Sequence, residues 1–304
     1  MGKFDKLYKL APVWLQNAMV STYGAYWHWL RFGGSYKNHL QNYRQRERFN
    51  KEQWSEYQQG ELKRLLSLCV EYVPYYRDHW NESEHKSAMN SELGKLPLLE
   101  KDAIRQDSSK FRREDMHPFP KLVFHTGGTT GTPIATQFTL SEMRNSLALR
   151  EARSANWSGV SFDESRATFS GRMVEPDPES ATNIYRYNFV EKQVCFSAFH
   201  LKPVTAHLYV DALKKHHITW LTGYAVSYYL LAKYILEQNI EIPKIKSVIT
   251  TSEKLTPAMR EVMQKAYGCK IYEEYSTVEN ALFASECEHG RLHVSPDVSI
   301  IEIL

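Results

Sequence analysis

The second half of the chain alternates between short apolar runs and longer stretches with helical periodicity. In order, these segments predict strand, helix, strand, helix and strand over residues 219–223, 226–238, 247–251, 257–267 and 270–275. Strands that alternate with helices pair in parallel through right-handed crossovers, so the pattern predicts an α/β fold with parallel β-sheets layered with helices. In such sheets, ligands bind beyond the carboxyl ends of the strands.

The first half of the chain is predicted to be mostly helical. Residues 36–90 carry helical patterns, with an apolar face within residues 62–70 that ends at Pro74. A further helix is predicted over residues 139–154, with Ser141 as its N-cap. We therefore expect a helical N-terminal region over residues 1–110, packed on an α/β core over residues 111–304.

Two shorter segments of the second half are also assigned from their composition. The apolar run at residues 166–170 predicts a strand, and residues 173–182, with two prolines and several acids, predict an exposed loop.

Residues 11–30 carry no charge and are rich in aromatic side chains, namely Trp14, Tyr23, Tyr26, Trp27 and Trp29. A membrane-spanning helix needs about 20 mostly apolar residues, and polar residues interrupt this stretch too often. The pattern favours a helix packed on the rest of the protein. The alternative is peripheral contact with a membrane surface, where amphipathic Trp and Tyr side chains are stable.

Charge and cysteine usage narrow the class of protein. A net charge of +3 over 304 residues, with acids and bases interleaved, argues against nucleic acid as a partner. The cysteines at positions 69, 195, 269 and 287 show no paired spacing, and the first ten residues do not resemble a secretory signal. These features predict a cytoplasmic protein with reduced thiols, and they do not predict its oligomeric state.

A glycine-rich loop at residues 125–133 reads His-Thr-Gly-Gly-Thr-Thr-Gly-Thr-Pro. Its glycines let the backbone approach a ligand closely, and its threonine hydroxyls and backbone N–H groups suit phosphate oxygens. It lacks the lysine of the P-loop of GTPases and ATPases. A surface hairpin loop is the alternative, since turns are rich in the same residue types.

Two polar segments follow predicted parallel strands. Thr251-Ser252-Glu253-Lys254 comes after one strand, and Ser276-Thr277-Val278-Glu279 comes after the next. Because the carboxyl ends of parallel strands meet at one edge of the sheet, both segments are expected at the ligand crevice.

Together these three motifs resemble those of adenylate-forming enzymes, the superfamily of acyl-CoA synthetases. The loop resembles Thr-Ser-Gly-Thr-Thr-Gly-x-Pro with Gly128 in place of Ser, residues 251–254 resemble the adenine-contacting turn, and residues 275–279 resemble Tyr-Gly-x-Thr/Ser-Glu. Residues 12–17, 72–77, 199–201 and 221–224 are similar to the CapK-like branch, relatives of phenylacetate-CoA ligase often associated with capsular polysaccharide biosynthesis.

This resemblance implies ATP and Mg²⁺ as cofactors, a small-molecule acid or other nucleophilic substrate, and CoA as a candidate acceptor. The implied catalytic residues are Glu279, which also holds Mg²⁺, Thr126 and Thr129. The implied nucleotide-binding residues are Thr126, Gly127, Gly128, Thr129, Thr130, Gly131, Ser252, Glu253, Lys254, Tyr275, Ser276 and Thr277. Tyr275 would stack on adenine, and a carboxylate oxygen of the substrate would attack the α-phosphate.

The chain departs from the family pattern at two places. Val278 stands where the family has a Thr or Ser that touches the α-phosphate. The chain also ends at Leu304, where residues 298–304 predict an unfinished strand, so we expect a truncated product without the C-terminal lid. The alternative functions are a catalytically silent nucleotide-binding or scaffold protein and a membrane-surface interaction protein.

Cys287, His289 and His293 offer candidate ligands for Zn²⁺. Their spacing is weak evidence, and surface histidines are the commoner interpretation. Some relatives complete such a zinc site with two later cysteines, so only a partial site, at Cys287 and His293, is predicted here.

Overall fold

The computed structural model describes Tyr8 and residues 11–116, 122–127, 133–171, 174–175, 177 and 182–302. The chain divides into two compact units. Unit 1 comprises the described residues of Met1–Tyr43, Arg144–Ser276 and Phe283–Val294, and unit 2 those of Arg44–Met143, Thr277–Leu282 and Ser295–Leu304. The boundary near residue 110 that the sequence predicts stays a prediction.

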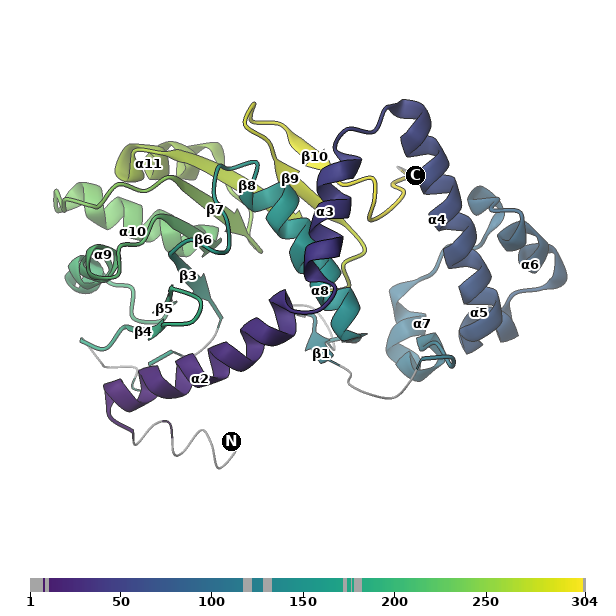
Figure 1. Cartoon of the computed structure of the whole chain (residues 1–304), viewed down its shortest axis with the longest axis horizontal. Coiled ribbons are helices and arrows are strands. Elements are labelled where there is room, and N and C mark those ends of the chain that lie inside the picture. Colours follow the sequence, from purple (N-terminus) through teal and green to yellow (C-terminus); the bar gives the residue numbers. More distant parts are fainter. Residues whose placement is uncertain are drawn as a thin grey trace. The chain divides into compact units, whose positions relative to one another are not determined.

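Unit 1 is built on an eight-stranded sheet of order β10-β9-β8-β7-β6-β3-β5-β4 (Figure 1). Its strands are β3 (Arg166–Ser170), β4 (Tyr185–Asn188), β5 (Gln193–Ser197), β6 (Trp220–Tyr224), β7 (Ser247–Thr251), β8 (Lys270–Ser276), β9 (Phe283–Glu286) and β10 (Leu292–Val294). The five central strands, from β8 to β5, are parallel, and the strands beyond them are antiparallel. The predicted α/β fold is therefore confirmed, including the adjacent parallel pair β7 and β8.

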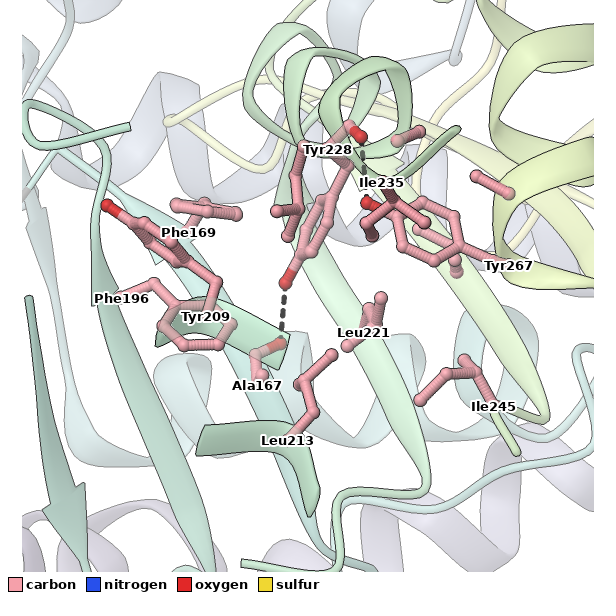
Figure 2. Close-up of a cluster of buried hydrophobic side chains, with 14 of the residues drawn as sticks. Ala167, Phe169, Phe196, Tyr209, Leu213, Leu221, Tyr228, Ile235, Ile245 and Tyr267 are labelled. Carbon is pink, nitrogen blue, oxygen red and sulfur yellow. Dashed lines mark hydrogen bonds between the residues drawn. The ribbon is translucent and has the colours of Figure 1, made fainter. Parts of the chain in front are cut away.

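One face of this sheet carries the main hydrophobic core. It is covered by α9 (Ala206–Lys215), α10 (Ala225–Glu237) and α11 (Pro257–Tyr267). Figure 2 shows the Tyr228 side chain of α10 reaching across this core to strand β3. Its hydroxyl donates to the carbonyl oxygens of Ala167 at 2.8 Å and Thr222 at 3.1 Å, while Tyr267 donates to the Tyr228 carbonyl. Buried phenols are thus paired, as a core requires.

The opposite face of the sheet is covered by two helical segments. α8 (Leu140–Leu149) continues into the π-helical segment η3 (Arg150–Ala155), and Ala155 packs with Trp220, Ile249 and Tyr272 of the sheet. α2 (Val13–Phe32) lies along β4 (Figure 1).

The helix predicted within residues 11–30 is confirmed, and it packs on its own protein. The Tyr187 amide donates to the Asn17 side chain at 3.0 Å. Trp14 and Trp29 are exposed on the helix, so membrane-surface contact stays a prediction. Across the described residues, every helix is too short or too polar to cross a bilayer.

Unit 2 contains a group of helices and a two-stranded hairpin. The elements are α4 (Lys51–Tyr72), α5 (Pro74–His79), α6 (Glu82–Met89), η1 (Leu93–Lys95), α7 (Lys101–Gln106), η2 (Ser108–Phe111), β1 (Leu122–His125) and β2 (Ala135–Phe138). α3 (Tyr36–Arg46) precedes α4 in the chain. Asn50 and Asn81 each begin a helix with a reciprocal capping box. Pro74 does end α4, as predicted, but it also opens α5, because a proline is well tolerated at the first helical position.

Three local predictions are wrong. The Glu142 amide donates to the Thr139 hydroxyl, so Thr139 rather than Ser141 caps α8. Residues 298–302 form no strand. The third is wrong only in part: within the predicted exposed loop 173–182, Asp177 and Thr182 are exposed, whereas Glu175 is buried and its carboxylate pairs with the buried guanidinium of Arg186 at 3.0 Å. Residues 173, 176 and 178–181 lie outside the described residues.

Removing the Tyr228 hydroxyl tests the core. Burial raises the pKa of Tyr228, so the phenol stays neutral and can donate. We expect Tyr228→Phe to lower the free energy of unfolding by about 1–2 kcal/mol, since two buried carbonyls lose a donor. Urea denaturation measures this change in the free energy of unfolding. Tyr229→Phe, on the same helix but with no hydrogen bond from its hydroxyl in the described structure, is the matched control, and equal losses in both variants would contradict the assignment.

His216 gives the fold a pH dependence. Its ring stacks on Tyr187 with centroids 4.0 Å apart, and burial, with the charges of Lys215 and His217, lowers its pKa. The unfolded chain therefore binds the proton more tightly, so stability is present above about pH 6.5 and is lost as the pH falls below it. The His216→Phe variant keeps a ring that can stack on Tyr187. Between about pH 7.5 and pH 5 it should lose less stability than the unaltered chain does. An NMR titration that gave His216 a raised pKa would refute this.

Candidate functional site

The carboxyl edge of β7 and β8 brings several predicted site residues together in unit 1. Thr250 lies opposite Glu273 in the parallel register, and the Thr251 hydroxyl lies 3.4 Å from the Glu274 carboxylate. Ser252 follows with a left-handed φ of 68°, which turns the chain away from the strand. Tyr275 is 55% exposed at the same edge. The turn at residues 252–254 and the end of β8 therefore form one polar edge.

Glu253 has a structural role that the sequence did not reveal. Its carboxylate accepts a hydrogen bond of 2.8 Å from the backbone N–H of Val226, in the first turn of α10. A carboxylate at a helix N-terminus pairs with an otherwise unsatisfied donor and with the helix dipole. Lys254 is exposed and makes no ion pair within the described residues, so its ammonium group remains available to an anion.

Two further residues at this edge were missed by sequence reasoning. Glu274 is buried in β8, and Arg150 of η3 pairs with its carboxylate at 3.0 Å. This ion pair holds the strand beside Thr251 and gives the edge a fixed charge arrangement. No sequence signal identifies either residue, because β8 also carries Lys270 and Glu273 and because Arg150 lies on a polar helical segment.

The edge continues onto β3 and β6. Gly223 has a φ of 133°, and a Cβ there would lie 2.0 Å from the Phe169 carbonyl oxygen, so only glycine allows these strands to pair. A Cβ on Gly171 would lie 2.8 Å from the Tyr224 hydroxyl. The absence of a side chain at Gly171 thus leaves room for the hydroxyl of Tyr224.

The described part of the glycine-rich loop belongs to unit 2. β1 and β2 pair as an antiparallel hairpin, which Thr126 closes through its amide to the Ile134 carbonyl at 3.0 Å. The Thr126 hydroxyl accepts from the Ile134 amide at 2.9 Å, so its own proton can be donated to a ligand. Among the described residues, no atom lies within 4 Å of a Cβ built on Gly127. Gly128, Thr129, Thr130 and Gly131 lie outside the described residues.

Thr277 and Glu279 also belong to unit 2, in the connection between β8 and β9. Thr277 closes this turn by donating its amide to Leu282 and accepting from the Ala281 amide at 3.1 Å. The Glu279 carboxylate is exposed and forms no hydrogen bond or ion pair in the described structure. An exposed, unpaired carboxylate suits Mg²⁺, which keeps several of its waters. The complete set of predicted site residues is divided between the two units and stays a prediction.

The candidate zinc ligands are only partly assembled. His293 Nε2 lies 3.2 Å from Cys287 Sγ on the β9–β10 hairpin. His289 points to solvent beside Glu288. Searching the described residues finds no group of three His, Cys, Asp or Glu side chains able to hold a metal ion. The partial zinc site at Cys287 and His293 therefore stays a prediction.

Comparison with known proteins gives a curated relative and solved structures of similar fold. No family model matches the chain. It is 25% identical over 300 residues to the protein CapK of Staphylococcus aureus, a match that covers 97% of this chain but only 65% of that protein. The chain thus spans slightly less than two thirds of the relative's length.

The solved structures show what the chain shares with other proteins. 2-Hydroxyisobutyryl-CoA ligase in the postadenylation state, in complex with 2-HIB-AMP, superposes with a TM-score of 0.54 at 16% identity, covering 79% of this chain and 52% of that one. The same ligase with 2-HIB-AMP and CoA in the thioesterification state gives 0.52 at 15% identity, covering 82% and 55%. The chain therefore shares its α/β fold with an adenylate-forming CoA ligase.

Proposed function

We propose that the chain is an ATP-dependent adenylate-forming ligase that activates a small-molecule acid as its acyl adenylate. The observation that carries this proposal is the adjacency of the 252–254 turn and Tyr275 at the carboxyl edge of β7 and β8. This edge is where parallel α/β sheets bind their ligands. The shared fold with a ligase solved in complex with an acyl adenylate supports the same conclusion.

The proposed roles follow from the chemistry of each residue. The exposed ring of Tyr275 stacks on the adenine, and the ammonium group of Lys254 faces anionic groups. Hydroxyl and amide donors of the loop, from Thr126 to Gly131 and including Thr129, hold phosphate oxygens. Glu279 is the residue that would hold Mg²⁺, which neutralises phosphate charge when bound.

The proposed reaction begins with the formation of an acyl adenylate. A carboxylate oxygen of the acid forms a bond to the α-phosphorus of ATP, and the bond to the β-phosphate oxygen breaks, which releases pyrophosphate. Catalysis of such a step depends on positioning and on stabilising charge. Val278 contributes no hydroxyl to the α-phosphate, so Thr277 or Ser276 supplies that contact. CoA is the proposed acceptor of the acyl group. Its thiol sulfur would form a bond to the acyl carbon and lose its proton to solvent, while the bond from that carbon to the phosphate oxygen breaks and AMP leaves.

The proposed branch of the superfamily, the cellular location and the substrate class rest on motif resemblance. We place the chain in the CapK-like branch, supported by the match to the Staphylococcus aureus protein, and we assign it to the cytoplasm. Its substrate would then be an acid that serves surface polysaccharide assembly.

The discriminating measurement is pyrophosphate exchange with a panel of aryl and alkyl acids. An active ligase exchanges label into ATP only when its acid is present. Glu279→Ala should reduce the exchange rate by about 100-fold or more, because the metal loses a ligand beside the reacting phosphates. Glu261→Ala removes an exposed carboxylate from α11 and should leave the rate unchanged. Full exchange in Glu279→Ala would refute the metal assignment.

Two rival functions predict different outcomes of simple assays. A catalytically silent nucleotide-binding or scaffold protein would bind ATP without exchange for any acid. A membrane-surface protein, suggested by the exposed rings of Trp14, Tyr26 and Trp29, would co-sediment with anionic vesicles regardless of ATP. Vesicle binding without ATP binding would replace the ligase proposal.

A further inference from the structure

A cavity of about 190 Å³ lies within unit 1 between α2 and the β4–β5 hairpin. Its walls include Tyr23, Gly24 and Trp27 from the helix and Asn188, Gln193 and Cys195 from the hairpin. β4 is five strand spacings from β8, which at about 4.8 Å per spacing is roughly 24 Å. The cavity is therefore separate from the polar edge that carries Tyr275.

Asn188 presents an unpaired hydrogen-bond donor to this cavity. Its side-chain oxygen accepts from the amides of Val190 at 3.1 Å and Glu191 at 3.3 Å, which fixes the orientation of the amide group. The amide nitrogen consequently faces the other way, and the described residues give it no acceptor. The Asn188 residue is 5% exposed, and its amide nitrogen opens onto the cavity, where an acceptor can bind it.

Gly24 allows the helix to approach this donor closely. A Cβ built on Gly24 would lie 2.2 Å from the Asn188 amide nitrogen, so any side chain there would force the Asn188 amide to move. Both residues line the cavity. The glycine therefore keeps the Asn188 amide at the cavity wall, where any larger residue would displace it.

Gln193 supplies an acceptor beside the donor. It stands directly opposite Asn188 in the antiparallel register of β4 and β5, where side chains on one face have Cβ atoms about 5 Å apart. Its amide nitrogen donates to the Thr168 hydroxyl at 2.8 Å, which leaves its oxygen as an acceptor without a partner among the described residues. A donor and an acceptor side by side complement a carboxamide or lactam, which offers one C=O and one N–H.

The remaining walls select for an uncharged ring. Tyr23 and Trp27 meet edge to face with centroids 5.8 Å apart, and Val20 adds apolar surface. The two cations at the cavity already face carboxylates, Arg186 on Glu175 at 3.0 Å and Arg31 on Glu191 at 3.7 Å. A cavity of about 150 Å³ accommodates benzene, so this one has space for a ring and a small polar group.

We propose that this cavity binds a small neutral ligand made of one aromatic ring with a carboxamide or lactam group. The Asn188 amide donates to the ligand carbonyl, the Gln193 oxygen accepts its N–H, and the ring lies against Tyr23 and Trp27. The site is independent of the nucleotide site and of the ligase reaction.

The test uses benzamide as the probe, with the complete 304-residue chain. Protein-observed NMR should show saturable shifts of the Asn188 side-chain amide and the Trp27 indole N–H, with a dissociation constant below about 10 mM. Benzoate has the same ring but a charge and no N–H, and it should bind at least about 10-fold more weakly. Saturating ATP should leave the dissociation constants of benzamide and benzoate unchanged.

Two variants locate the binding. Asn188→Asp keeps the acceptor for the Val190 and Glu191 amides but loses the donor, and it should weaken benzamide binding about 10-fold or more. Asn38→Asp makes the same charge change at an exposed position of α3 and should bind as the unaltered chain does. If Asn188→Asp fails to fold, Gln193→Met removes the acceptor instead. No saturable binding, shifts confined to other residues, or equal affinity in Asn188→Asp or Gln193→Met would overturn the proposal.

Discussion

The parallel pairing of β7 with β8 is the constraint on which the rest of unit 1 depends. Because both strands run in the same direction, the 252–254 turn and Tyr275 must leave the sheet at the same edge. The Glu274 carboxylate stabilises that edge, because it contacts the Thr251 hydroxyl and pairs with Arg150. Shifting the register by one residue would exchange the faces of β8 and bury Tyr275 instead of exposing it.

Helices on both faces make this pairing stable. Parallel strands are buried on both sides, and here α9, α10 and α11 cover one face while the η3 segment packs on the other, with α2 along β4 at the sheet margin. Tyr228 connects α10 to β3 and β6 through its hydroxyl, so the helix layer and the sheet are joined by hydrogen bonds as well as by apolar contact. The cavity beside Asn188 lies where the α2 layer meets the hairpin at the sheet margin.

Much of unit 1 could be predicted from local sequence, because its elements have strong periodicity and distinct ends. The bounds of β7 and α11 match the prediction, since β-branched residues fill the strand and Thr256, Pro257 and Gly268 mark the helix ends. The Arg150–Glu274 pair and the buried Glu175 could not be predicted, because each depends on a partner far away in the chain. Residues 298–302 were misassigned, since apolar residues without a pairing partner form no strand. The candidate residues of unit 1 followed from two local motifs, because each motif directly follows a strand with a clear apolar pattern.

The most direct test of this account is a crystal structure of the chain with a non-hydrolysable ATP analogue and Mg²⁺. The account predicts adenine density against the Tyr275 ring and the 252–254 turn, at the carboxyl edge of β7 and β8. Nucleotide density at any other part of the chain, with the Tyr275 edge occupied only by solvent, would contradict it.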